Sequence, residues 1–225
     1  MNFCALDIET IPNWDLPKEC IPQFDPDSVA LGNLKDKDKI EAKIEAERKK
    51  FDEGLIKKMS LDPDLCKVIY VMVHRTETLS LGHFNDEYYL IGNTWAYIKT
   101  LYLNHISLIT YNGLSFDLPV LWHSAIRLGI LVDPRMYKDL TKKYDNRYHY
   151  DVMQIMSGWD RQRYKSFDFY LCWLGLEPKM GDGSMVYDWW QKGEYESIRK
   201  YCEHDVDMLV KLWEKLEPYF VGKAI

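Results

Sequence analysis

The sequence is poor in cysteine and has no cysteine motif of the kind that binds metal. Only five of its 225 residues are cysteine, an odd number scattered along the chain, and no two of them stand in a CxxC spacing. A small secreted domain built on disulfides and a zinc site built on cysteine pairs are therefore not expected. We expect free thiols and a reducing, cytoplasmic compartment.

A long apolar run and an excess of positive charge are also missing. No stretch of about 18 apolar residues occurs, and the first residues lack the basic and apolar regions of a secretory signal, so we expect neither a membrane span nor a signal peptide. The net charge is −6, whereas proteins that coat nucleic acid are usually basic, so any contact with nucleic acid is expected to be local. With 47% hydrophobic residues, the chain can build a sizeable core, and we expect a single domain over residues 1–225.

Two acids, Asp7 and Glu9, follow the first apolar run at residues 3–6, which we interpret as a buried strand. On a strand, residues two apart point to the same face, about 6.6 Å from each other. Two anions held so close repel one another and burial adds to the cost, whereas a bound Mg²⁺ would remove it. Two solvated acids at a strand end are the alternative, and this motif alone does not separate the two.

Two further acids lie where burial or a site is expected. Asp117 follows the strand and turn at 107–113 and falls in the first turn of a helix, where the helix dipole alone would favour an acid. Junctions of this kind are also where α/β folds build their sites. Asp205 shares one face of the last helix with Tyr201 and with apolar core residues, so it is expected to be buried. A buried acid needs a partner, and a metal shared with Asp7 is the simplest one.

Hydrophobic periodicity predicts an α/β protein with one mixed sheet, its strands early and its helices late. Strands are expected at residues 3–6, 67–74, 77–84, 107–111 and 148–150. Helices are expected at residues 35–58, 93–103, 115–128, 167–175, 185–191 and 196–216, the second of them capped by Asn93. Residues 133–147 are expected to be irregular. Asp151 stands at the N-cap of a further short helix, and capping is preferred to metal binding as its role.

Three motifs together resemble those of the DEDD superfamily of 3′-5′ exonucleases. In order from the first strand to the last helix, they are Asp7-x-Glu9, Asn112-Gly113-x-x-Phe116-Asp117 and Tyr201-x-x-x-Asp205. The tyrosine is typical of the DEDDy branch, since the histidine of the other branch would stand at Lys200. Residues 183–188 and 201–206 are most similar to the predicted exonucleases related to the proofreading domains of family-B DNA polymerases.

The resemblance implies a ribonuclease-H-like fold, a mixed five-stranded sheet flanked by helices. It implies hydrolysis of DNA from single-stranded or frayed 3′ ends with two Mg²⁺ or Mn²⁺ ions, releasing nucleoside monophosphates in proofreading or repair. The catalytic residues that it implies are Asp7, Glu9, Asp117, Tyr201 and Asp205, and the four acids among them are the metal ligands.

Each of these five positions has an expected role. Asp7 bridges both metals, while Glu9 and Asp205 complete the metal on the nucleophile side. Asp117 serves the leaving-group side, mainly through water. Tyr201 orients the attacking water, because a phenol with a pKa near 10 is a poor base at pH 7.

Three residues and one segment are candidates for contact with the substrate. The backbone at Thr10 would meet the terminal hydroxyl, and Asn112 would bond to the substrate or to its own loop. Phe116 would stack on the last base or belong to the core. Residues 161–165 mix basic side chains with an aromatic one, which suits a single-stranded backbone or an ordinary solvated loop.

Residues 13–65 depart from the family pattern, in which a hairpin commonly joins the first two strands. Their helix at 35–58 combines a narrow apolar stripe with dense charges of both signs, which indicates a solvated face or a flap that guides DNA. We expect this helical insert to shape the cleft or to bind a partner, and removal of residues 35–58 to alter the preferred substrate length. The protein is expected to be free-standing or recruited by another protein, such as a replication or repair protein.

Three other interpretations stay open at the level of sequence. A phosphatase with an Asp nucleophile would need a second Asp where Glu9 stands. A nucleic-acid-binding module that has lost activity would keep the fold, although all five catalytic positions are filled. The same chemistry on RNA is not separated from action on DNA, although the polymerase-like motifs favour DNA.

Overall fold

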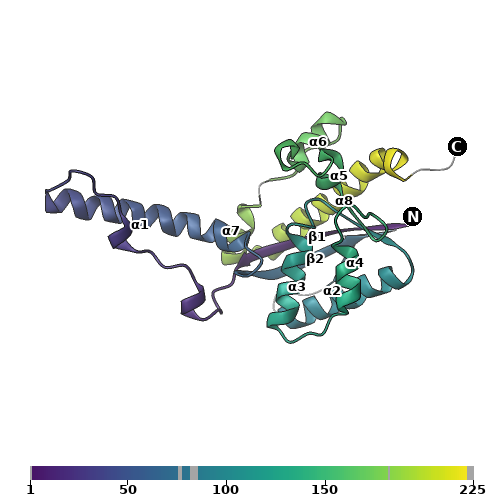
Figure 1. Cartoon of the computed structure of the whole chain (residues 1–225), viewed down its shortest axis with the longest axis horizontal. Coiled ribbons are helices and arrows are strands. Elements are labelled where there is room, and N and C mark those ends of the chain that lie inside the picture. Colours follow the sequence, from purple (N-terminus) through teal and green to yellow (C-terminus); the bar gives the residue numbers. More distant parts are fainter. Residues whose placement is uncertain (1, 76–77, 82–85, 182, 222–225) are drawn as a thin grey trace.

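The computed structural model describes residues 2–75, 78–81, 86–181 and 183–221, and it shows a mixed sheet covered by helices on both faces (Figure 1). The expected five-stranded α/β architecture is confirmed. All five cysteines are free thiols, as their spacing predicts. In the described part of the chain, no helix combines the length and the apolar composition that a membrane span requires.

The first strand occupies the centre of the sheet, where its apolar residues are buried from both sides. The order across the sheet is β3-β2-β1-β4-β5. β1 pairs antiparallel with β2, which pairs antiparallel with β3, whereas β1, β4 and β5 run parallel. The strands are β1 (Phe3–Pro12), β2 (Cys66–His74), β3 (Thr78–Ser80), β4 (Ser107–Thr110) and β5 (His149–Asp151).

Alternate residues of β1 pack into two different cores. One core, which includes Leu6 and Ile8, lies under α2 (Glu87–Leu103), α3 (Asp117–Arg127) and α4 (Pro134–Leu140). The other core includes Phe3 and Ala5. Its helices are α5 (Val152–Ser157), α6 (Phe167–Trp173), α7 (Met185–Lys192) and α8 (Tyr195–Phe220). Because side chains of a strand alternate between faces, Asp7 and Glu9 share the face of Phe3 and Ala5 and point toward α8.

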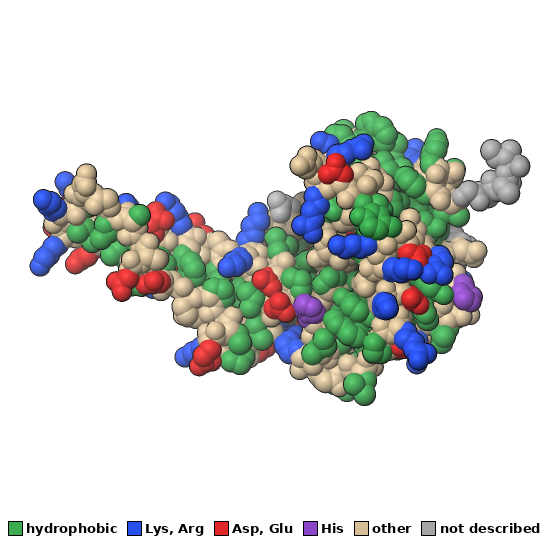
Figure 2. Space-filling model, in the orientation of Figure 1, with side chains coloured by type: hydrophobic (Ala, Val, Ile, Leu, Met, Phe, Trp, Pro, Cys, Tyr) green, Lys and Arg blue, Asp and Glu red, His purple; other side chains and the backbone are tan. Residues whose placement is uncertain are grey.

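Residues 13–60 form a projection that we call the arm (Figure 1). The arm contains η1 (Lys18–Cys20), η2 (Pro26–Ser28) and the long helix α1 (Lys37–Ser60). Among the residues of α1, all of which the structure describes, Met59 alone is buried, and it lies where the helix rejoins the sheet. Farther out, Phe24 packs on Phe51 with ring centroids 5.7 Å apart. Acidic and basic side chains are mixed over the surface of the arm (Figure 2).

Two sequence-based expectations about helices are wrong. α2 begins at Glu87 and is capped by Asp86, whose carboxylate accepts a hydrogen bond from the backbone of Tyr89, so Asn93 is an interior residue of the helix. The irregular segment expected at 133–147 contains α4, which begins at an Asp-Pro pair. Asp133 caps that helix and Pro134 fits its first turn, a start signal that the dense charges around it concealed.

Smaller differences concern the ends of elements. β1 continues through both acids to Pro12, and β3 is limited to Thr78–Ser80, while Glu77 and residues 82–84 of the strand expected at 77–84 lie outside the described residues. Asp151 ends β5 and caps α5, accepting a hydrogen bond from the backbone of Gln154 at 3.2 Å, so its predicted capping role is confirmed.

Candidate active site

Four acids from three elements lie within electrostatic range of one another. Asp7 and Glu9 come from β1, Asp117 is the first residue of α3, and Asp205 lies on α8. Glu9, Asp117 and Asp205 are only 7%, 3% and 4% exposed, while Asp7 is partly exposed. The mutual repulsion of these groups connects Glu9 with the other three. The structure therefore brings together the acids that are far apart in the sequence.

Burial and mutual repulsion change how readily these acids ionise. Burial, reinforced by the charge of Asp205, raises the pKa of Asp7 to about 7. Burial and the neighbouring carboxylates raise the pKa of Glu9 and of Asp117 well above the usual range. Burial also raises the pKa of Asp205, although Lys179 opposes the shift. A group of buried acids in this condition favours a cation among them.

The donor atoms fit a hard divalent cation. Ligand atoms of Asp7, Glu9 and Cys202 all lie within 4.8 Å of one another. Oδ1 of Asp205 is buried, and no described residue forms a hydrogen bond with it. Burial and the nearby carboxylates raise the pKa of the Cys202 thiol, which keeps it neutral and leaves oxygen atoms as the ligands. Oxygen ligands of this kind suit Mg²⁺ or Mn²⁺ better than a soft metal.

Lys179 is a site residue that the sequence did not indicate. Its ammonium forms an ion pair with Oδ2 of Asp205 at 2.5 Å and lies 5.2 Å from the ring centroid of Tyr201. Burial alone would lower the pKa of Lys179, but Asp205 and Asp7 outweigh it and raise the pKa. Lys179 stands in the irregular chain between α6 and α7, where no periodicity or motif singled it out.

Tyr201 lies on α8 one turn before Asp205 and is 3% exposed. Burial, followed by the charge of Asp205, raises the pKa of its phenol above the usual range. The hydroxyl therefore stays protonated at neutral pH. The ring packs against Trp189 of α7, with centroids 5.8 Å apart, which fixes the direction of the side chain.

The loop before Asp117 is held by Asp151 and by a close glycine contact. The backbone amides of Asn112 and Leu114 both donate to the Asp151 carboxylate, at 3.1 and 2.9 Å. Asn112 has a left-handed backbone with φ of 70°. At Gly113, any Cβ would stand 2.2 Å from the hydroxyl oxygen of Thr110, so only glycine fits. The Asn-Gly pair thus fixes where α3 begins.

The remaining candidates occupy mixed positions. Thr10 follows a β-bulge after Glu9, and its hydroxyl donates to the carbonyl of Ser60 in the arm at 2.6 Å. Phe116 is half-buried and packs against the core on the α2 and α3 side. His204 is half-buried, and its Nε2 lies 3.1 Å from the carbonyl oxygen of Pro178, the residue before Lys179.

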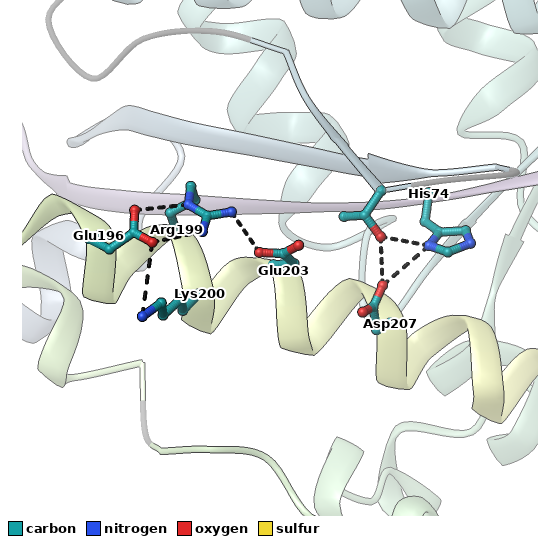
Figure 3. A network of polar contacts seen from close by, with 7 residues as sticks. His74, Glu196, Arg199, Lys200, Glu203 and Asp207 are labelled. Atoms are coloured by element: carbon teal, nitrogen blue, oxygen red, sulfur yellow. Dashed lines mark hydrogen bonds and ion pairs between the residues drawn. The ribbon is translucent and has the colours of Figure 1, made fainter.

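Polar side chains of α8 pair with one another and with the sheet. Arg199 pairs with Glu196 and Glu203, and Asp207 lies 3.2 Å from His74 of β2 (Figure 3). Lys200, at the position that holds histidine in the other branch, is exposed, and its ammonium lies 4.0 Å from the Glu196 carboxylate. Its side chain therefore points away from the four acids of the site.

Comparison with known proteins adds two findings. Residues 63–217 match a family described as "Predicted 3'-5' exonuclease related to the exonuclease domain of PolB". That region contains Asp117, Tyr201 and Asp205, while Asp7 and Glu9 precede it. No curated protein matches the sequence.

The fold is similar to that of a family B DNA polymerase from the hyperthermophilic archaeon Pyrobaculum calidifontis. The TM-score is 0.61 at 19% identity, over 97% of this chain and 25% of the polymerase chain. The chain thus spans about a quarter of that protein's length, and the likeness concerns the fold alone. Both findings agree with the resemblance seen in the motifs.

Proposed function

Because the chain belongs to the family of predicted 3′-5′ exonucleases related to the exonuclease domain of PolB, we propose that it hydrolyses single-stranded or frayed DNA from the 3′ end with two divalent metal ions. The products are nucleoside monophosphates. We assign this activity to proofreading or repair, with the protein acting alone or beside a polymerase or repair protein.

The observation that carries the proposal is that four acids lie together and that, within the described part of the chain, a buried oxygen of Asp205 has no hydrogen-bond partner. Such a group is unfavourable without positive charge, and Lys179 supplies one charge against four carboxylates. A structural role alone gives no reason to keep these acids together.

The four acids Asp7, Glu9, Asp117 and Asp205 would hold the metals. When bound, two Mg²⁺ or Mn²⁺ ions activate a water molecule and stabilise the leaving oxygen of the phosphodiester. Asp7 would serve both ions, Glu9 and Asp205 would serve the ion on the nucleophile side, and Asp117 would serve the ion on the leaving-group side.

Two further side chains act directly on the reacting groups in this proposal. The protonated hydroxyl of Tyr201 donates a hydrogen bond that orients the attacking water, because its raised pKa excludes it as a base. The ammonium of Lys179 pairs with the Asp205 carboxylate and is placed to offset negative charge on the phosphate of the substrate.

The terminal nucleotide is assigned to the side of the site next to Thr10. The β-bulge after Glu9 interrupts the regular pairing there, and the backbone of this bulge is assigned to the terminal hydroxyl. The exposed part of the Phe116 ring would stack under the base, and Asn112 positions the loop before Asp117.

The position of the arm supports a role for it in forming the substrate cleft. A cavity of about 560 Å³ lies between α1 and α7 and is lined by residues that include Ile56, Leu61 and Tyr187. It adjoins the acids, because its residue Ser60 accepts the Thr10 hydrogen bond and its residue Gly183 lies beside Tyr201. The insert would thus form one wall of the cleft.

The proposal is tested with single-stranded DNA and RNA labelled at either end, in Mg²⁺, Mn²⁺ or EDTA. A 5′ label should remain on products that shorten by single nucleotides, and a 3′ label should be released as a mononucleotide. EDTA and the variants Asp7→Ala and Asp205→Ala should stop both. Faster turnover of RNA than of DNA would reassign the substrate, and binding without any turnover would make the protein a binding module.

A further inference from the structure

A second pocket lies beside the loop that leads to Asp117. Its volume is about 300 Å³, and it is lined by residues of that loop, of the segment after α4 and of the segment after α5. The residues that matter here are Ser115, Lys143, Tyr144, Trp159, Arg161 and Tyr164. None of the four acids of the candidate active site lines it.

The basic groups of this pocket carry uncompensated charge. Nearby, Lys142 and Arg147 both pair with Asp145, at 3.1 and 2.7 Å. Lys143 and Arg161 are exposed, and within the described ranges neither of them forms an ion pair with an acid. Asp145 thus neutralises Lys142 and Arg147, whereas Lys143 and Arg161 keep their positive charge at the pocket. Two such charges suit a phosphate.

The rings of Tyr144 and Trp159 form the apolar side of the pocket, and the backbone of both residues has an unfavourable conformation. Tyr144 is 75% exposed, and its ring centroid lies 4.7 Å from that of Trp159. Both residues are in the left-handed region, with φ of 63° and 65°. Bulky residues rarely adopt this conformation, and such outliers concentrate at ligand sites. The strained backbone at these two residues places two flat rings side by side at a pocket that faces solvent.

The pocket is connected rigidly to the proposed site. Asp151 accepts hydrogen bonds from the amides of Asn112 and Leu114, and it caps α5, whose residue Gln154 also lines the pocket. The hydroxyl of Tyr164 donates to the Gln154 side chain at 2.6 Å. Asp117, two residues after Ser115, is the acid assigned to the leaving-group side.

We propose that this pocket binds a nucleotide of the strand that is retained after each cleavage, upstream of the scissile bond. This inference rests on the proposed exonuclease function. The leaving oxygen belongs to the retained strand, so a pocket on the side of Asp117 meets that strand. Lys143 and Arg161 contact its phosphate, and a base stacks on the rings of Tyr144 and Trp159.

The test compares a long substrate with a minimal one. The long substrate is an eight-residue oligothymidylate, and the minimal one is the p-nitrophenyl ester of thymidine 5′-monophosphate, which has no upstream nucleotide. For Trp159→Ala and Arg161→Ala, the ratio of kcat/KM on the octamer to kcat/KM on the ester should fall about tenfold, mainly through KM on the octamer. An equal loss on both substrates would show a merely structural role and overturn the proposal.

Matched controls are available outside the pocket. Arg135 is an exposed arginine of α4, and Trp173 is an exposed tryptophan of α6; neither lines the pocket. Arg135→Ala and Trp173→Ala should leave the ratio within about twofold. Similar losses in all four variants would reduce the proposal to general surface charge and refute it.

Direct binding separates this inference from the proposed function. Fluorescein-labelled octathymidylate in EDTA should bind the Trp159→Ala and Arg161→Ala proteins about tenfold more weakly than the parent protein. If the parent protein hydrolyses neither substrate but shows this difference, the exonuclease proposal fails and the pocket stands as a nucleic-acid site. If it hydrolyses the octamer and the variants bind normally, the pocket proposal alone fails.

Discussion

The candidate active site and the arm use charged residues in opposite ways. In the site, four acids lie together beside Lys179. Glu9, Asp117 and Asp205 are buried, Asp7 is partly exposed, and the pKa of each acid is raised. In the arm, charges lie in water and pair along α1, as with Glu47 and Lys50 at 2.8 Å. Exposed charges cost little, whereas buried like charges need a cation. Activity and stability should therefore depend on the identity of each acid in the site. The contribution of the arm should depend on its shape rather than on any single charge.

The largest contrast is expected between two buried glutamates. Glu9 and Glu87 are 7% and 8% exposed, but Glu87 pairs with Arg127 at 2.7 Å and accepts a hydrogen bond from the Val68 amide. Glu9→Gln should reduce activity on the order of a thousandfold. It should also raise the melting temperature of the metal-free protein, because one repelling charge is removed.

Glu87→Gln is the matched control and should act in the reverse direction. Activity should stay near that of the parent protein, while the melting temperature falls by a few degrees because the pairing of Arg127 is weakened. Exonuclease assays and thermal unfolding in EDTA measure both variants. Equal stability effects for the two glutamates would contradict the view that Glu9 is held against repulsion.

The next largest effect is expected at Lys179. Lys179→Met keeps much of the side-chain volume but removes the charge beside Asp205, so activity should fall about tenfold to a hundredfold. The metal-free protein should also melt at a lower temperature at pH 8. Lys99→Met changes an exposed lysine of α2 and serves as the control. An unchanged rate for Lys179→Met would remove this residue from the chemistry.

Metal and pH should act together on stability. The pKa of Asp7 is about 7 in the folded protein and near 3.8 ordinarily, so the folded state binds more protons between these values. Stability of the metal-free protein should then decrease as pH rises from about 4 to 7. Stabilisation by Mn²⁺ should increase over the same range, reaching about 5–10 °C at a hundredfold excess over Kd.

Thermal unfolding in EDTA and in Mn²⁺ between pH 5 and 8 measures this linkage. Asp7→Asn should flatten the pH dependence and abolish the Mn²⁺ effect. A metal-induced shift of the same size in that variant would place the binding of metal elsewhere.

The smallest effect on stability is expected in the arm. Replacing residues 18–57 by a short Gly-Ser linker keeps buried Met59 and the Thr10–Ser60 hydrogen bond, so the melting temperature should change by about 2 °C or less. KM and the preferred substrate length should change severalfold, because the wall formed by Ile56 is lost. Unchanged kinetics on every substrate would rule out a role for the arm in the cleft.

Local sequence was sufficient wherever pattern and geometry coincide. The alternation along β1 predicted that Asp7 and Glu9 share a face, and the helical period of α8 predicted burial of Asp205. Local signals failed where two of them competed. Asn93 looked like a cap, yet Asp86 begins α2 earlier because the apolar residues between them pack on the sheet. α4 is short, and burial of Met136 and Leu140 stabilises it more than its own periodicity does.

The sequence alone determined the family and the acids proposed as ligands, because these follow from short-range periodicity and fixed motif spacing. Only the tertiary structure decided that Lys179 meets Asp205, that Asp151 holds the loop before Asp117, and that Tyr144 and Trp159 share a pocket. These pairs join irregular segments or distant elements. No repeat in the chain encodes such contacts, because their distances arise from how the layers pack against the sheet.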